Sequence, residues 1–223
     1  MENKPFELNK FQKTILKELA NSPLKDNFYW TGGTALAFFY LKHRLSYDID
    51  LFSNKQFEYT VVKKLVDKIA KATKINKIEE KKIHDRWEFL ISNDQNIRID
   101  FVFYDHKQIN PRKQWQGVWV DSLEDMAANK TLALIDRHDP KDAFDIYYIL
   151  TKHNYTDKKL LNLVKKKFHS DFPVSLFWSQ CLLGSQHFRN LTPLLIGKNK
   201  DKIINQINEF FEKESAESVK EQI

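Results

Sequence analysis

The 223-residue chain is poor in the residues that break, cross-link or anchor a protein. It contains 5 glycines, 6 prolines and one cysteine, Cys181. One cysteine cannot form an internal disulfide, which is typical of proteins from a reducing compartment. The apolar runs are much shorter than the roughly 20 residues that a membrane-spanning helix needs, and the first residues show no signal-peptide core. We therefore expect a cytoplasmic protein that has no membrane partner.

The composition is that of a globular protein with a basic surface. The chain is 42% hydrophobic and 13% aromatic, which is enough for a substantial core. Its net charge of +6 is compatible with a polyanionic partner such as nucleic acid. Lysine-rich solvated helices would give the same charge, so the charge alone does not require such a partner.

Periodicity predicts a mixed half followed by a helical half. No repeat or long linker interrupts the chain. The first half is expected to contain helices at 6–20, 34–42 and 60–73, and strands at 27–30, 48–52, 86–92, 96–104 and 117–120. Helices are expected at 122–137 and 139–152, then through 155–223, with a disordered polar tail from Glu212. We predict an α/β domain at 1–121 and a helical domain at 122–223.

Two aspartates interrupt an apolar strand. Asp48 and Asp50 are two residues apart, so on a strand both side chains point to the same face. Such close carboxylates repel each other unless a cation neutralises them, and Mg²⁺ prefers oxygen ligands of this kind. Asp100 is a third acidic residue in an apolar strand. The three could hold two metal ions, as phosphoryl-transfer enzymes do, or could simply be solvent-facing strand residues.

A glycine pair precedes the aspartates. Gly32 and Gly33 lie between a predicted strand and a predicted helix. Glycines allow a ligand close to the backbone, and a helix N-terminus attracts anions such as a triphosphate. A plain strand-to-helix turn is the alternative.

The helical half carries charges where apolar residues are expected. Lys130 lies on the apolar stripe of its helix, with Arg137 two turns later. On the surface of the next helix, the position of Asp142 falls between those of Ile146 and Ile149, within the apolar stripe. Asp145 lies one turn away, at the edge of that stripe. A buried cation usually has an anionic partner. Either an interhelical salt bridge or one wall of an active-site cleft would explain this pattern.

Together these segments resemble a known family. GGTALA, RLSYDIDLF, RIDFV and LEDMAANKTLALIDRHDPKDAFDIYYIL are similar to the nucleotidyltransferase toxins of the AbiEii/AbiGii type, in the DNA polymerase β-like nucleotidyltransferase superfamily. The similarity runs in order from about Thr31 to Leu150, and residues 155–223 match only as a generic helical extension.

The resemblance implies an α+β fold, with a mixed β-sheet flanked by helices and a helical C-terminal part that completes the active-site cleft. It implies that Asp48, Asp50 and Asp100 bind two Mg²⁺ ions. It also implies that Gly32, Gly33 and Thr34 hold the nucleotide phosphates, that Lys130 contacts the nucleotide, and that Asp142 is required for activity. The further nucleotide-binding candidates are Arg44, Ser46, Arg137 and Asp145.

The function expected from the resemblance is transfer of NMP from an NTP to an acceptor, with release of pyrophosphate. The acceptor would be RNA, at the tRNA 3′ end, and the enzyme would be a bacterial toxin with a cognate antitoxin. Two alternatives stay open: an enzyme that modifies a protein or a small molecule such as an antibiotic, and an inactive binding module. No motif in the sequence selects the NTP base, the acceptor or the oligomeric state.

Overall fold

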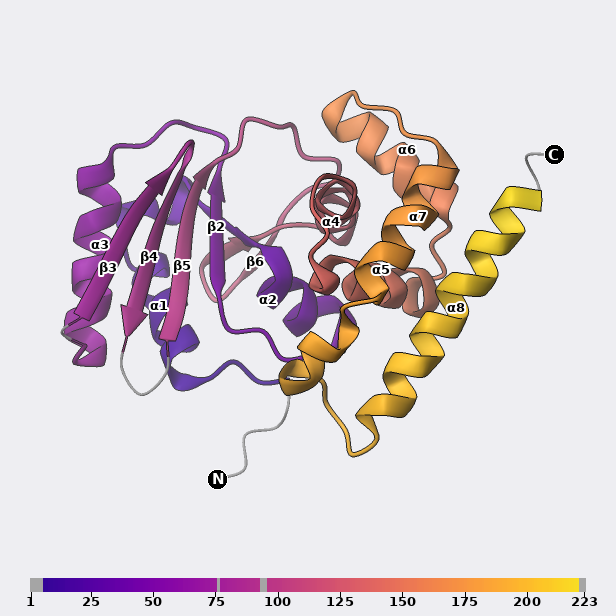
Figure 1. Cartoon of the computed structure of the whole chain (residues 1–223). Coiled ribbons are helices and arrows are strands. Elements are labelled where there is room, and N and C mark those ends of the chain that lie inside the picture. The colour runs from indigo at the N-terminus through magenta and orange to yellow at the C-terminus, as the bar shows by residue number, and fades with distance from the viewer. Residues whose placement is uncertain (1–5, 76, 93–95, 221–223) are drawn as a thin grey trace. The chain divides into compact units, whose positions relative to one another are not determined.

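A computed structural model describes residues 6–75, 77–92 and 96–220, apart from the side chain of Val219 (Figure 1). The chain groups into two compact units. The first contains the N-terminal residues up to Lys42 and residues 46–122, and the second contains residues 43–45 and everything from Leu123 onward. The short segment 43–45 therefore groups with helices that lie about a hundred residues later in the sequence.

The first unit is built on a seven-stranded mixed sheet. Its strands are β1 (Tyr29–Thr31), β2 (Ile49–Ser53), β3 (Lys77–Ile83), β4 (Arg86–Ser92), β5 (Asn96–Phe103), β6 (Lys113–Trp115) and β7 (Val118–Val120). The order across the sheet is β3-β4-β5-β2-β1-β7-β6. The pairs β2–β5 and β1–β7 are parallel, and the other neighbours are antiparallel. The predicted strands are confirmed, whereas β3 and β6 were not predicted.

The central strands have one apolar and one charged face. On β5, Ile97, Ile99 and Phe101 are at most 1% exposed, while Arg98 and Asp100 alternate with them. Phe101 contacts Phe28 and Phe89 edge-on, with ring centroids 5.2 and 5.9 Å apart. The apolar face is thus the core, and the residues between its members are directed to the opposite face.

The helices of this unit are α1 (Lys10–Ala20), α2 (Gly32–Leu36) and α3 (Tyr59–Thr73), with a 3₁₀ turn at Pro23–Asp26 and a π-helical turn at Ala37–Leu41. Helices α1 and α3 lie side by side behind the sheet in Figure 1. The predicted helix 6–20 starts later than expected because Asn9 caps it. Asn9 accepts from the Gln12 backbone N–H at 2.8 Å, and Gln12 accepts from the Asn9 N–H at 2.9 Å.

The predicted hairpin 86–104 is confirmed as the antiparallel pair β4–β5. The turn assigned to residues 93–95 lies outside the described residues. The predicted helix 34–42 begins two residues earlier, at Gly32, and becomes π-helical from Ala37.

The second unit is helical, as predicted. It contains α4 (Leu123–Asp136), α5 (Pro140–His153), α6 (Asp157–Phe168), α7 (Val174–Ser185), a 3₁₀ segment at Phe188–Leu194 and α8 (Lys200–Lys220). Asp139 caps α5, and its carboxylate accepts from the Lys141 N–H at 2.9 Å. Residues 43–45 join this unit because the Leu45 N–H donates to the Leu194 carbonyl at 2.8 Å.

The prediction of a disordered tail from Glu212 is wrong as far as Lys220, because α8 continues to that residue, and the last part of the predicted tail, 221–223, lies outside the described residues. Ile204, Ile207 and Phe211 are at most 5% exposed and recur at helical spacing. These anchors attach the first half of α8 to the unit, and the polar second half extends the same helix.

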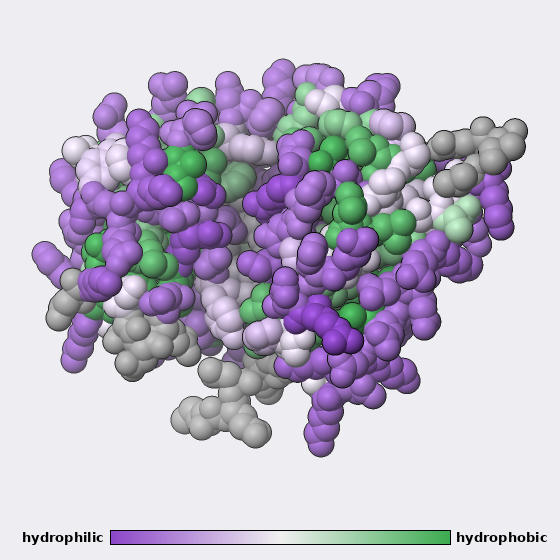
Figure 2. Space-filling view, in the orientation of Figure 1, coloured by the Kyte–Doolittle hydropathy of each residue, from purple (hydrophilic) through white to green (hydrophobic). Residues whose placement is uncertain are grey.

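Polar side chains cover most of the face shown in Figure 2, and the apolar ones gather in small patches. Tyr47, Val61 and Leu183 are the large apolar residues classed as exposed among those described. None of the described helices is long and apolar enough to cross a membrane.

Candidate functional site

Three acidic residues form a row on the charged face of the sheet. Asp50 of β2 is the register partner of Asp100 of β5, and Glu88 of β4 is the partner of Asp100 on the other side. Directly paired residues on neighbouring strands point to the same face. The register therefore brings together two of the predicted metal ligands, Asp50 and Asp100, and adds Glu88, which was not predicted.

Two arginines lie among these carboxylates. Arg86 Nη1 is 3.4 Å from Asp100 Oδ2, and Arg86 Nη2 is 3.5 Å from Glu88 Oε2. Arg98 Nη2 is 3.0 Å from Asp48 Oδ2, while its Nε is 3.5 Å from Asp100 Oδ2 and its Nη1 is 3.9 Å from Glu88 Oε2. Four carboxylates and two guanidinium groups leave a net charge of −2 when all are ionised.

Asp100 is the buried member of this group. It is 3% exposed, and its Oδ1 has no hydrogen-bond partner. Burial and the nearby negative charge of Asp50 raise the pKa of Asp100 to about 7, although Arg98 and Arg86 act in the opposite direction. An unpaired carboxylate oxygen beside a second carboxylate is suited to a divalent cation.

The third predicted ligand, Asp48, precedes β2 and is paired with Arg98. With the side chains as they stand, no three His, Cys, Asp or Glu residues within the described part of the chain are arranged to hold a metal ion. The two-metal site with Asp48, Asp50 and Asp100 therefore stays a prediction, and its assembly requires Asp48 to exchange Arg98 for the ion.

Gly32 fits tightly against Asp50. Its φ is +76°, and a β-carbon on residue 32 would overlap the Asp50 carboxylate and lie 2.8 Å from the Asp50 β-carbon. Thr31, just before it, is the register partner of Asp50. The glycine pair and the carboxylates, predicted from separate segments, are thus neighbours at the β1–β2 pair.

Thr34 and Ser46 position the segment before β2. The buried Thr34 hydroxyl donates to the Asp48 carbonyl and lies 2.9 Å from Ser46 Oγ. Gln12 of α1 donates to the Ser46 and Tyr47 carbonyls at 3.0 Å each. These contacts hold the backbone of Asp48, a role that the sequence did not indicate for Gln12. Gly33 lies in the first turn of α2.

A second missed group holds the end of β1. Asp121 is fully buried and accepts hydrogen bonds from Thr31 Oγ1 at 3.1 Å and Arg112 Nε at 3.3 Å. Arg112 also donates to Asn54 Oδ1 at 2.8 Å and stacks 3.4 Å from the Tyr29 ring. This network fixes the strand end that leads into Gly32.

In the helical unit, Lys130 and Asp145 are the centre of a buried ion network. Lys130 Nζ lies 2.7 Å from Asp142 Oδ1 and 2.8 Å from Asp145 Oδ2. Arg44 binds Asp145 with both arms of its guanidinium, at 2.7 and 2.8 Å. Arg137 Nε lies 2.8 Å from Asp142 Oδ2. The structure thus brings together five predicted site residues, Arg44, Lys130, Arg137, Asp142 and Asp145, and the interhelical salt bridge of Lys130 and Arg137 with Asp142 is present.

The network keeps its carboxylates ionised. Burial alone would raise the pKa values of Asp145 and Asp142, but Arg44 and Lys130 hold the pKa of Asp145 well below its usual range, and Lys130 and Arg137 lower that of Asp142. Burial likewise opposes the charge on Lys130, yet Asp142 and Asp145 keep its pKa raised. The side chain of Arg137 is 59% exposed, against 11% for Lys130.

His43 completes the network and was not predicted. Its Nε2 lies 2.6 Å from Asp145 Oδ1, and its Nδ1 is buried without a hydrogen-bond partner. Burial lowers the pKa of His43 to about 4, helped by the charges of Arg44 and Lys130. A neutral imidazole therefore donates from Nε2 to Asp145.

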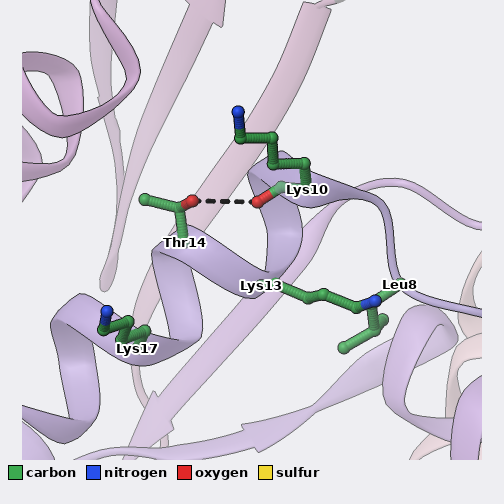
Figure 3. Close-up of a pocket in the computed structure, with 5 residues that line it drawn as sticks. All are labelled: Leu8, Lys10, Lys13, Thr14 and Lys17. Atoms are coloured by element: carbon green, nitrogen blue, oxygen red, sulfur yellow. Dashed lines mark hydrogen bonds between the residues drawn. The ribbon is translucent and has the colours of Figure 1, made fainter.

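Helix α1 presents a separate basic hollow of about 360 Å³, which Figure 3 shows. Three lysines, Lys10, Lys13 and Lys17, line this hollow together with Leu8 and Thr14. The three lysines are exposed and share one helix face by their i, i+3, i+7 spacing. That spacing was the available signal in the sequence.

Comparison with known proteins gives a consistent assignment. Residues 14–222 match the family described as nucleotidyl transferase AbiEii toxins of type IV toxin–antitoxin systems. An uncharacterised protein of Aquifex aeolicus is 30% identical over 172 residues, which cover 75% of this chain and 79% of that protein.

Two solved structures from Helicobacter pylori share the fold. A candidate nucleotidyltransferase has a TM-score of 0.59 at 19% identity, with 93% of this chain and 94% of that one covered. The protein JHP933 has a TM-score of 0.58 at 19% identity, with 97% and 100% covered.

Proposed function

Since the chain belongs to the AbiEii family of nucleotidyl transferase toxins, we propose that it transfers NMP from an NTP to an RNA acceptor, the tRNA 3′ end. The observation that carries this proposal is the register of Asp50 with Asp100, with Gly32 against the first of them. Such a paired carboxylate face beside a glycine turn suits a metal-bound triphosphate.

Each residue has a role in this proposal. Asp50 and Asp100 would hold Mg²⁺, together with Asp48 once it is released from Arg98. When bound, Mg²⁺ supplies charge neutralisation for the attacking hydroxyl and for the leaving pyrophosphate. The backbone N–H groups of Gly32 and Gly33, at the start of α2, would donate hydrogen bonds to the phosphates.

Thr34 and Ser46 would act indirectly, since their contacts position Asp48. In the helical unit, we assign Lys130 and Asp142 to the same reaction on the strength of the family motif, with Arg44 and Asp145 as the pair that orients them. Arg137 is the most exposed cation of that network and is the one suited to meet a phosphate directly.

The RNA acceptor is supported by charge. The chain carries +6 overall, and α1 presents three exposed lysines on one face. Membership of a toxin–antitoxin family implies a cognate antitoxin as a partner, and cytoplasmic RNA would be the target of the free toxin.

The test is transfer of label from each α-labelled NTP, with Mg²⁺, to total RNA, protein and an aminoglycoside offered side by side. We expect label in the RNA, lost with Asp50→Asn and Asp100→Asn. Asp85→Asn is the matched control, because Asp85 is exposed at the β3–β4 turn of the same sheet. Label in protein or in the aminoglycoside instead of RNA would show that the acceptor is not RNA. Equal label transfer by the wild type and by the Asp50 and Asp100 variants would reject the mechanism.

A further inference from the structure

Arg98 lies between the two ends of the predicted metal site. Its guanidinium reaches Asp48 at 3.0 Å and Asp100 at 3.5 Å, with Glu88 at 3.9 Å. Asp48 and Asp100 are both proposed ligands, and they belong to different strand segments. One guanidinium therefore spans the carboxylates that a divalent cation would have to share.

The neighbouring Arg86 provides a contrast. It also contacts Asp100 and Glu88, at 3.4 and 3.5 Å, but no ion pair with Asp48 is found for it among the described residues. Removing either arginine takes one positive charge from the same face. Only the removal of Arg98 also frees Asp48.

The pair of Arg98 with Asp48 is poised for exchange. Both side chains are 37% exposed, whereas that of Asp100 is 4% exposed. Partly exposed ion pairs contribute little net free energy, because water solvates the separated groups well. Guanidinium is also singly charged and weakly hydrated, while Mg²⁺ concentrates two charges on a small ion.

We propose that Arg98 is an internal counter-ion that occupies the position of the divalent cation between Asp48 and Asp100, so that the cation binds by displacing it. The inference rests on the proposed metal site. In the cation-free protein, Arg98 neutralises carboxylates that would otherwise repel each other. On loading, Asp48 turns from Arg98 to the cation, and the side chain of Arg98 moves into solvent.

The test measures binding of Mn²⁺, the probe in place of Mg²⁺, by calorimetry on the whole chain. Arg98→Gln is expected to bind Mn²⁺ roughly two- to fivefold more tightly than the wild type. The matched control Arg86→Gln, which removes the same charge without freeing Asp48, is expected to change the affinity less. Arg98→Lys keeps the charge but loses the fork, so its affinity should lie between those of the wild type and Arg98→Gln.

Thermal unfolding gives a second readout. Without Mn²⁺, Arg98→Gln should melt below the wild type, because its carboxylates are left less neutralised. With saturating Mn²⁺ its melting temperature should rise by more than that of the wild type. Arg98→Lys serves both measurements if Arg98→Gln does not fold.

Each contrary result has its own meaning. Unchanged or weaker Mn²⁺ binding by Arg98→Gln would overturn the counter-ion role while leaving the proposed function in place. If Arg86→Gln increases the Mn²⁺ affinity as much as Arg98→Gln does, the effect is due to the loss of a positive charge and not to displacement of Arg98, and the proposal is overturned. Absence of Mn²⁺ binding in all variants would overturn the metal site itself, and the inference with it.

Discussion

The Asp50 carboxylate packs against Gly32 so closely that a β-carbon on residue 32 would overlap it. The positive φ of Gly32, +76°, turns the position of its missing β-carbon into the carboxylate of Asp50. The glycine therefore allows this acidic side chain to stand at the pairing of β1 with β2, next to Asp100.

The first prediction concerns Gly32→Ala. Its positive φ strains alanine by about 1–2 kcal/mol, and the overlap with Asp50 adds about 1–3 kcal/mol. Gly197→Ala is the matched control: its φ is +106°, but nothing lies within 4 Å of the added carbon. Chemical denaturation should therefore show a larger loss for Gly32→Ala, and calorimetry should show weaker Mn²⁺ binding for it alone. Equal losses in the two variants would mean that Asp50 moves aside freely.

The second prediction concerns Asp100 and pH. The pKa of Asp100 is about 7 in the folded protein, against an ordinary value of 3.8, so between these pH values the folded protein retains a proton that the unfolded chain has lost. Stability from this group is present below about pH 4 and is lost as pH rises toward 7. The total change is on the order of 4 kcal/mol.

The measurement is the free energy of unfolding of the wild type and of Asp100→Asn, in chelator, at several pH values between 4 and 8. The wild type should lose stability relative to the variant across that range. Parallel curves would show that Asp100 titrates normally.

The strands that carry these residues were predictable, because apolar and polar residues alternate through most of β5 and β4, with Leu90 and Val102 as the exceptions. Strand β3 was not predicted, since its residues from Lys77 to Ile83 place charges on both faces at an edge of the sheet. The start of α1 was misplaced because the capping pair of Asn9 and Gln12 is a stronger signal than the apolar Phe6.

The site was predictable in its residue types but not in its pairings. The position of Asp100 within an apolar strand marked it, but its partners Asp50 and Glu88 follow from register, which is set by the tertiary structure. Glu88 alternates like any solvent-facing strand residue. His43 and Arg44 reach Asp145 across about a hundred residues of sequence, and no local pattern encodes that contact.

The third prediction concerns His43, whose contribution to stability changes with pH in the opposite direction to that of Asp100. The pKa of His43 is about 4 in the folded protein, against an ordinary value of 6.5, so the unfolded chain binds the proton more readily. Stability from neutral His43 is present above about pH 6.5 and is lost as pH falls toward 4, by on the order of 3 kcal/mol. His43→Gln keeps a donor for Asp145 but cannot titrate.

Relative to His43→Gln, the wild type should therefore lose stability on acidification from pH 7 to 4. An NMR titration of the His43 ring should show no protonation above about pH 5. Protonation near pH 6.5 would contradict the buried neutral state.

The last prediction separates support from chemistry in the ion network. Asp145→Asn removes the carboxylate shared by Arg44, His43 and Lys130, and Arg44 is left buried with its side chain 2% exposed. Breaking a buried ion pair in this way costs about 3–5 kcal/mol. In Lys130→Met, by contrast, Asp142 keeps Arg137 and Asp145 keeps Arg44. Urea denaturation should therefore show a much smaller loss for Lys130→Met than for Asp145→Asn.

Lys130→Met tests the proposed role of Lys130 in the reaction, because this variant is expected to lose less stability than Asp145→Asn. If Lys130 acts on the nucleotide, label transfer should fall at least tenfold under conditions where the variant is fully folded. Arg137→Gln, at the exposed end of the same network, should cost less stability than Asp145→Asn, because Asp142 keeps Lys130, and should lower the apparent affinity for the NTP. Full transfer activity in folded Lys130→Met would show that the ion network of α4 and α5 is structural, and that Lys130 has no part in the reaction.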